Sequence, residues 1–250
     1  MRLGVVSDIH GNLPALQAVV ADAGPIDGWL DLGDLLSGPL WPAQTADWLM
    51  ARGWPTIAGN HERQVLTQPY EAMSATDRHT ATRLRPEHRA WIASLPAAMS
   101  PAPGLLCVHG TPGSDLQYLL QTVTPAGLRE AGDDEVLQRL AGVAVPLLLC
   151  GHTHLPRDRV VGGTRIANPG SVGLPAYDDE HPFQHVVENG SPQARYAVVE
   201  HDGGGWRVQL RGVDYDWEAA ARRAEAHGRG DWADALRTGR VGRRERDVLR

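Results

Sequence analysis

The stretch Leu3-Gly4-Val5-Val6-Ser7-Asp8-Ile9-His10-Gly11-Asn12 contains the pattern on which the whole chain is built. Residues 3–6 are small or apolar, as is typical of a short buried strand, and the run stops abruptly at polar residues. Asn12 can cap a helix, and Pro14 falls in the first turn of that helix. The pattern therefore predicts a strand, a polar loop and a helix, in that order.

The same pattern recurs along the chain and predicts an α/β protein. Strand-like runs occupy residues 3–6, 28–32, 56–58, 105–108 and 146–150, and helical segments begin at Pro42 and Pro86. Strands that alternate with helices of this length are typical of βαβ units in a layered core. We expect one domain over residues 1–250, in which late strands within residues 195–213, turning at residues 202–205, form a second sheet packed on the first. Residues 178–192 read as a surface loop and residues 214–250 as a helical tail.

The composition excludes several classes of protein. With 250 residues, 42% of them hydrophobic, and a net charge of -6, the chain can bury a sizeable core and is not a disordered protein. The arginines near the C-terminus alternate with Glu245 and Asp247, so they predict a frayed tail and no nucleic-acid partner. Two cysteines favour a reducing compartment, and we find neither a signal peptide nor an apolar run of the roughly 20 residues that span a membrane. These features predict a cytoplasmic protein with no membrane partner, and they leave its oligomeric state open.

Five polar motifs follow strand-like runs, and together they predict a metal site. They are Asp8-Ile9-His10, Gly33-Asp34, Gly59-Asn60-His61-Glu62, His109-Gly110 and Gly151-His152-Thr153-His154. Each motif alone is also typical of a turn or a helix cap. Their recurrence favours metal ligands, because the carboxyl ends of strands in an α/β sheet converge on one crevice. Oxygen and imidazole donors without thiolate suit Mn, Fe, Zn, Co or Ni and argue against a structural cysteine-type zinc site.

The order of these motifs resembles that of the calcineurin-like metallophosphoesterase superfamily. Residues 7–12, 33–39 and 168–173 are similar to its bacterial and archaeal, YfcE-like phosphodiesterase branch, and the motifs together cover residues 7–173. The resemblance implies a four-layer αββα sandwich, in which two mixed sheets are flanked by helices.

The resemblance also implies a role for each motif residue. One divalent ion would be held by Asp8, His10 and His154, a second by Asn60, His109 and His152, with Asp34 bridging both and His61 acting as the catalytic histidine. Two such ions, of which manganese is favoured, would produce a bridging hydroxide for direct attack on phosphorus, and His61 would protonate the leaving group. The implied activity is hydrolysis of a small phosphodiester or phosphomonoester, for example a nucleotide or a cyclic nucleotide.

Two other functions compete with this reading. A dinucleoside polyphosphate hydrolase would use the same ions, and a non-catalytic scaffold would share the fold, although all the expected ligands and His61 are present. Residues 33–39 lack the Asp-Arg-Gly that protein phosphatases carry at this point, so a protein phosphatase is disfavoured and no carboxylate that orients His61 is identified. Glu62 is expected to cap the following helix.

Three segments around the motifs remain open. Residues 168–171 either support the loop at residues 151–154 or form a plain turn. The segment 67–96 could be a flap whose cationic side chains meet a phosphate, although an exposed helix face is favoured. Its candidate side chains are Arg78, His79, Arg83, Arg85, His88 and Arg89. No residue that binds the rest of the substrate is identified.

Overall fold

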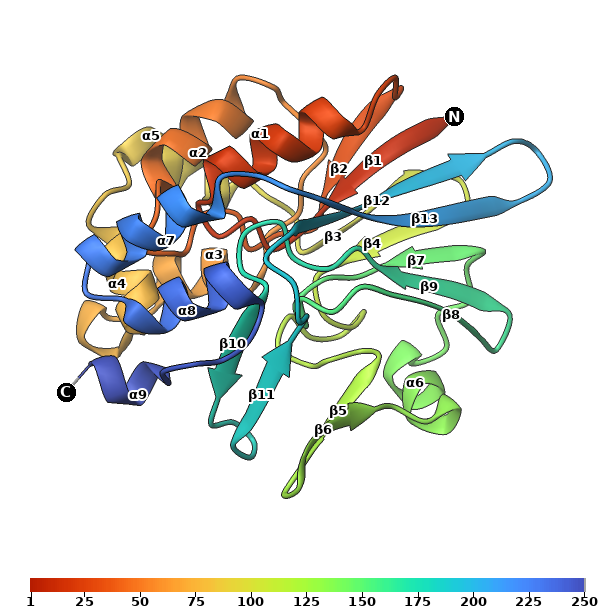
Figure 1. Cartoon of the computed structure of the whole chain (residues 1–250). Coiled ribbons are helices and arrows are strands. Elements are labelled where there is room, and N and C mark those ends of the chain that lie inside the picture. The colour runs from red at the N-terminus through yellow and green to blue at the C-terminus, as the bar shows by residue number, and fades with distance from the viewer. Residues whose placement is uncertain (250) are drawn as a thin grey trace.

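Two mixed β-sheets face each other in the computed structural model, which describes residues 1–249 (Figure 1). The first sheet has the order β13-β12-β1-β2, formed by Trp206–Val213, Ala194–His201, Arg2–Val6 and Gly28–Asp31. The second has the order β3-β4-β7-β9-β8, formed by Ala98–Ala102, Leu105–Val108, Leu147–Leu149, Thr164–Asn168 and Arg157–Val161. Each sheet combines parallel and antiparallel pairs. The predicted α/β sandwich of two mixed sheets is confirmed.

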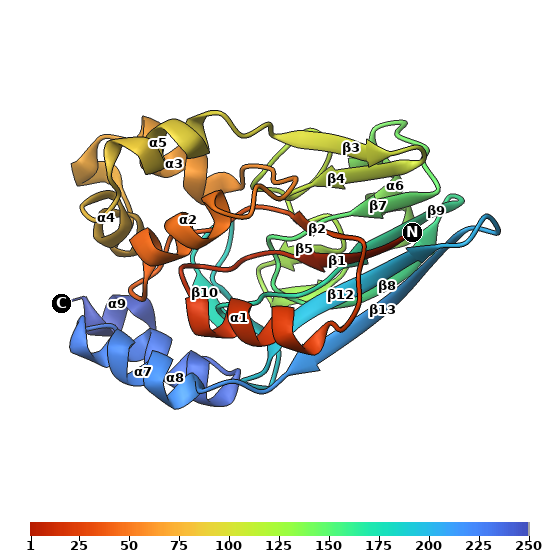
Figure 2. The same ribbon diagram turned by 90° about the horizontal axis from the view of Figure 1, so that it is seen from above.

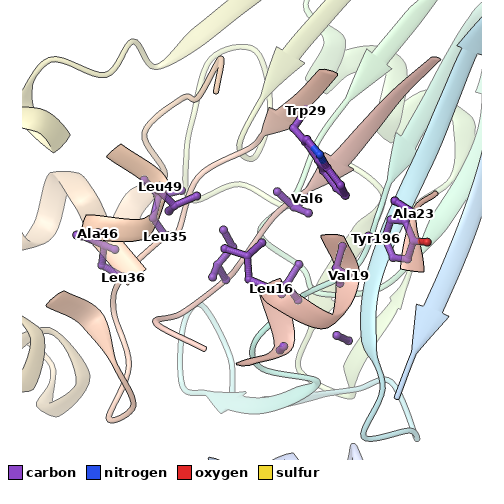
Figure 3. Close-up of a cluster of buried hydrophobic side chains, with 14 of the residues drawn as sticks. Val6, Leu16, Val19, Ala23, Trp29, Leu35, Leu36, Ala46, Leu49 and Tyr196 are labelled. Carbon is purple, nitrogen blue, oxygen red and sulfur yellow. The ribbon is translucent and has the colours of Figure 1, made fainter. Parts of the chain in front are cut away.

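The alternation of side chains along the strands produces the layers. Leu3 and Val5 in β1 face Leu147 and Leu149 of the second sheet, in a buried cluster between the two sheets. Val6 points to the opposite face, where a separate cluster contains residues of the outer helices (Figure 3). Successive side chains of a strand point to opposite faces of the sheet. Because both odd- and even-numbered positions of β1 are apolar, both faces of the first sheet are buried.

Helices cover the outer faces of both sheets. Helices α1 and α2 lie on the outer side of the first sheet (Figure 2), where Leu16 and Val19 of α1 pack around Val6. Helix α6 covers the second sheet through Val136 and Leu140. The α-helices are Leu13–Asp22 (α1), Pro42–Met50 (α2), Asn60–Thr67 (α3), Ala75–Ala81 (α4), Pro86–Ala93 (α5), Asp133–Leu140 (α6), Trp217–Ala226 (α7), Gly230–Thr238 (α8) and Glu245–Val248 (α9). In the described part of the chain, no helix has the length and apolar character needed to cross a membrane.

The late strands differ from expectation. Strands β12 and β13 do not form a separate sheet but extend the first one, where β12 pairs antiparallel with β1 from Arg2 opposite Glu200 to Val5 opposite Ala197. The predicted turn at residues 202–205 does join β12 to β13. The free edge of β1 explains the arrangement, because its backbone needs hydrogen-bond partners on that side as well as from β2.

The region expected to be a surface loop contains a hairpin. Strands β10 (Ala176–Asp179) and β11 (His185–Glu188) pair antiparallel and form a two-stranded sheet, as do β5 (Gln121–Thr124) and β6 (Gly127–Glu130). Polar residues on a short exposed hairpin resemble those of a loop, which explains why the sequence pattern did not reveal it.

The segment expected to be a helical tail contains helices α7, α8 and α9, but the frayed tail expected for its arginines is wrong. Helices α7 and α8 pack against each other through Ala220, Ala224 and Leu236, all of which are buried. Arg237 bridges Glu218 and Glu225 at 2.8 and 2.6 Å. Arg243 likewise pairs with Asp234 at 2.8 Å, so acidic residues of α7 and α8 hold these two arginines in place.

Candidate metal centre

The ends of two strands bring the first set of predicted ligands together. Asp8 and His10 follow β1, and His154 follows β7. One ligand atom from each of the three lies within 4.8 Å of the others, and all three side chains are buried. The Nε2 atoms of His10 and His154 are 3.1 Å apart, and His154 Nε2 is 3.4 Å from Asp8 Oδ1. These are the three residues that the family resemblance assigned to one ion.

A second set lies next to the first. Asp34, His109 and His152 offer ligand atoms within 4.8 Å of one another. His109 Nε2 is 3.1 Å from Asp34 Oδ2 and 3.2 Å from Asn60 Oδ1, so Asn60 adds a fourth donor to this set. Asp8 Oδ1 lies 4.0 Å from His109 Nε2 and thus joins the two sets. The structure therefore brings all seven predicted ligands to one place.

Backbone carbonyls orient three of the imidazoles. The Nδ1 atoms of His10, His109 and His154 lie 2.7, 2.8 and 2.7 Å from the carbonyl oxygens of Ser37, Leu32 and Leu174. A carbonyl can only accept, so each Nδ1 carries the proton and each Nε2 faces the ligand sets with a lone pair when the ring is neutral. Burial, reinforced by His154, lowers the pKa of His10 to about 3, which keeps that ring neutral.

Five of the predicted ligand residues have a strained backbone conformation, which fits a metal site. Six non-glycine residues of the described chain have positive φ, and five of them are Asp8, His10, Asp34, His152 and His154. This conformation is uncommon for residues with a side chain and persists only where the surroundings enforce it. Asp8 Oδ1 is also buried without a hydrogen-bond partner. An unpartnered carboxylate oxygen among imidazole nitrogens fits a divalent cation, since oxygen and nitrogen donors are what such ions bind.

Close backbone contacts hold the ligand loops against one another. A Cβ at Gly59 would collide with the side chain and the backbone nitrogen of Asp34, so only glycine permits this approach. Glu62, the residue expected to cap the helix, accepts hydrogen bonds from the backbone N–H groups of Gly59 and Asp34, each at 2.9 Å. Its carboxylate therefore ties the loop after β2 to the start of α3.

Residues 168–171 support the site and are not a plain turn. Asn168 donates from Nδ2 to the carbonyl oxygen of Gly151 at 2.7 Å and to Thr153 Oγ1 at 3.0 Å. Ser171 donates to the carbonyl oxygen of Asp8 at 2.7 Å. These bonds connect the loops that carry the two ligand sets, which resolves the alternative that the sequence left open.

His61 stands beside the ligand sets with a carboxylate partner. Its ring centroid is 5.4 Å from that of His10, and its Nδ1 lies 2.8 Å from Asp77 Oδ1 in α4. Burial alone would lower the pKa of His61, but the charges of Asp77 and Asp34 raise it to about 10. A raised pKa favours the protonated ring, in which Nδ1–H donates to Asp77 and Nε2 carries the second proton. Asp77 is the orienting carboxylate that the motifs did not reveal.

Asp77 is itself held by several bonds. Its side chain is 2% exposed, Ser37 Oγ donates to Oδ1, and Ser74 Oγ donates to Oδ2 at 2.9 Å. The backbone N–H of Asp77 in turn donates to Ser74 Oγ at 3.0 Å, as in a helix cap. Only this Ser-x-x-Asp cap was visible in the sequence, and it carries no sign of a link to His61.

The ligand sets open into a cavity of about 1190 Å³. Its wall comes from residues 72–78, residues 116–118, residues 176–182 and side chains of the C-terminal helices, among them Trp232. Trp232 packs edge-on against His10, with ring centroids 5.9 Å apart. The C-terminal helices therefore help to enclose the site, which their composition did not indicate.

The segment 67–96 divides into two parts. Arg78 lines the cavity, as a flap residue would. Arg83 instead bonds the carbonyl oxygen of its own helix residue His79 at 2.9 Å, and His88 bonds Asp47 at 3.0 Å. Residues 72–78 thus belong to the cavity wall, whereas His88 is buried away from it and Arg83 lies on the exposed surface that the sequence favoured.

Comparisons with known proteins agree with this geometry. The family model described as "Calcineurin-like phosphoesterase superfamily domain" matches residues 1–189. A search of curated proteins gives no match.

Solved structures share the fold over nearly the whole chain. A metallophosphoesterase from Sphaerobacter thermophilus is 23% identical, with a TM-score of 0.75 over 96% of this chain and 99% of that one. A hypothetical protein from Pyrococcus horikoshii OT3 is 20% identical, with a TM-score of 0.72 over the same shares. A structure described as a putative diadenosine tetraphosphatase is 17% identical, with a TM-score of 0.51 over 85% of this chain and 94% of that one. The fold and the family match together identify the chain as a member of the calcineurin-like phosphoesterase superfamily.

Proposed function

We propose that this protein is a dinuclear metal-dependent phosphoesterase that hydrolyses a small phosphodiester or phosphomonoester, such as a nucleotide or a cyclic nucleotide. The observation that carries the proposal is the position of two adjacent Asp/His sets, with His61 paired to Asp77 beside them, at a cavity of about 1190 Å³. A phosphate ester needs neutralisation of its charge, an activated water and a proton for the leaving oxygen, and these groups match the three needs.

The ligand sets divide into two ion sites in this proposal. Asp8, His10 and His154 would hold one ion, whereas Asn60, His109 and His152 would hold the second. Asp34 would be shared, because two neighbouring cations repel and a carboxylate between them reduces that repulsion. Two such ions supply charge neutralisation and water activation when they are bound. Manganese is our favoured metal, since nitrogen and oxygen donors of this kind accept it.

His61 and Asp77 would supply the proton that the leaving oxygen needs. Asp77 fixes the His61 ring by accepting from Nδ1–H, which leaves Nε2–H free to donate. Protonation of the departing oxygen converts an alkoxide into a neutral alcohol and so removes the main cost of breaking the ester bond. The buried environment of Asp77 keeps this pair in one geometry.

The two competing functions receive less support. A dinucleoside polyphosphate would bring several phosphates into the cavity, yet its wall carries Asp178, Asp179 and Glu180. A scaffold would have no use for five strained ligand residues with their oriented imidazoles. We propose accordingly that the partner of this site is a small phosphorylated molecule and that the protein works in the cytoplasm.

Metal analysis combined with kinetics tests the proposal. Purified protein incubated with Mn²⁺ should bind about two ions per chain and hydrolyse bis-p-nitrophenyl phosphate. Asp34→Asn should lose both metal and turnover, whereas His61→Ala should keep the metal and lose most turnover. An Asp34→Asn protein with full metal content and full rate would contradict the shared-ligand assignment. Absence of metal binding and turnover with every divalent ion would support the scaffold.

A further inference from the structure

Arg78 differs from every other arginine in the cavity wall. The wall contains Arg78, Arg139, Arg229, Arg243 and Arg246. Four of them lie within 4.0 Å of a carboxylate: Arg139 of Glu135, Arg229 of Asp231 and Glu245, Arg243 of Asp234, and Arg246 of Glu180 and Asp247. Within residues 1–249, Arg78 has no carboxylate at that distance. In the same range, its side chain makes one hydrogen bond, at 2.8 Å, from Nη1 to the carbonyl oxygen of Met73.

From this contrast we infer that Arg78 binds a second anionic group of the substrate, in addition to the phosphoryl group at the Asp/His sets. The inference rests on the proposed function and names its substrate class: a phosphate ester whose organic part carries one further phosphate or carboxylate. The bond to Met73 fixes one edge of the guanidinium and leaves the other donors for a ligand. A planar fork of N–H donors matches phosphate and carboxylate oxygens well.

The position of Arg78 suits this role. It follows Asp77 directly in α4, and both residues line the cavity together with His61. Asp77 orients His61, which would serve the leaving group, and Arg78 lines the same cavity as these two residues. An anion on that part of the substrate would meet Arg78 while its phosphoryl group occupies the metal centre.

The charges of the remaining wall limit the substrate to one such extra group. Apart from the ligand sets, the wall carries the acids Asp77, Asp178, Asp179, Glu180, Asp231 and Glu245. Asp231 and Glu245 pair with Arg229, and Glu180 pairs with Arg246. Within residues 1–249, Asp178 and Asp179 have no arginine within 4.0 Å, so these two acids would repel additional phosphates, since like charges in a partly buried site cost free energy. Among the wall arginines of residues 1–249, Arg78 is the one without a carboxylate partner, and it therefore provides for one further anion.

Matched pairs of inhibitors test the inference. The pairs are 2-phosphoglycolate against ethyl phosphate and ADP against AMP, in which the first member has one more anionic group. Inhibition of bis-p-nitrophenyl phosphate hydrolysis by the Mn²⁺-loaded protein gives the inhibition constants, and calorimetric titration of the same protein gives the binding constants without turnover. In at least one pair, the wild-type protein should prefer the more anionic member by about tenfold or more, which is about 1.4 kcal/mol.

Variants of Arg78 test whether this residue causes the preference for the more anionic inhibitor. Arg78→Gln should reduce the preference to nearly equal binding, whereas Arg78→Lys should keep part of it because the charge remains. Arg83→Gln is the control, since Arg83 lies nearby on the same segment but bonds only His79 and Thr82. Metal content and melting temperature should stay unchanged in all three. Equal binding within both pairs by the wild type, or a preference that survives in Arg78→Gln, would overturn the inference. Loss of hydrolysis with an intact calorimetric preference would instead contradict the proposed activity alone.

Discussion

The pair formed by His61 and Asp77 offers the sharpest test of how this site works. Asp77→Asn replaces the carboxylate by an amide of the same size, so packing around this nearly buried position changes little. The amide can still accept a hydrogen bond but carries no charge. Asp77 belongs to neither ligand set, so the metal content should stay at the wild-type level.

The size of the effect follows from the bond that is weakened. His61 Nδ1 and Asp77 Oδ1 are 2.8 Å apart, and a hydrogen bond to a charged group contributes about 1.5–3 kcal/mol. If this hydrogen bond stabilises the transition state but not the bound substrate, its loss should lower kcat roughly 10- to 100-fold and change KM little. The Asp77 charge also raises the pKa of His61, so its loss allows the ring to deprotonate at lower pH. Because the proton donor must be protonated, the alkaline decline of kcat should move to lower pH.

The assay compares leaving groups. Hydrolysis of bis-p-nitrophenyl phosphate and of diphenyl phosphate is measured for both proteins, because phenolate is the poorer leaving group and depends more on a proton donor. The loss in Asp77→Asn should be larger for diphenyl phosphate. Ser74→Ala is the control, since it removes the cap of α4 at a cost of about 1 kcal/mol in stability while Asp77 retains its charge. Equal losses for both esters, or a rate in Asp77→Asn close to that of the wild type, would refute the proton-donor role.

Three further predictions concern the fold and the metal centre. Gly59→Ala should lower metal content and turnover, because the new Cβ collides with Asp34, whereas Gly113→Ala, with open space around it, should behave as wild type in the same assays. Leu30→Ala, between the two sheets, should reduce the free energy of unfolding by about 2–5 kcal/mol in urea titrations, and a smaller loss would mean that the sheets pack loosely there. A chelator should lower the melting temperature of the wild type, and added Mn²⁺ should restore it, because an ion that binds only the folded state stabilises that state. The same chelator should have less effect on Asp34→Asn, and an equal shift in both proteins would argue against a site at Asp34.

Much of the fold could be predicted because its signals are local. The strand-like run at residues 105–108 is strand β4 with the same limits, and the helix expected after Asn12 is α1, with the Asn12 side chain accepting from the backbone N–H of Ala15. Apolar runs and caps act within a few residues, so a single sequence displays them. The pairing between strands, in contrast, could not be predicted. Strand β12 pairs with the edge of β1 through residues as distant in sequence as Arg2 and Glu200, and no local sequence pattern predicts this pairing.

The candidate site shows the same division. The sequence by itself determined which candidate ligands follow the strand-like runs, because Asp, Asn and His beside glycine form short motifs that can be recognised within a single segment. Only the tertiary structure decided that Asp77 orients His61, that Trp232 and the C-terminal helices enclose the cavity, and that Arg78 is left without an acidic partner. Each of these facts depends on the packing of segments that are distant in sequence, where geometry and burial, rather than residue type, determine which groups meet.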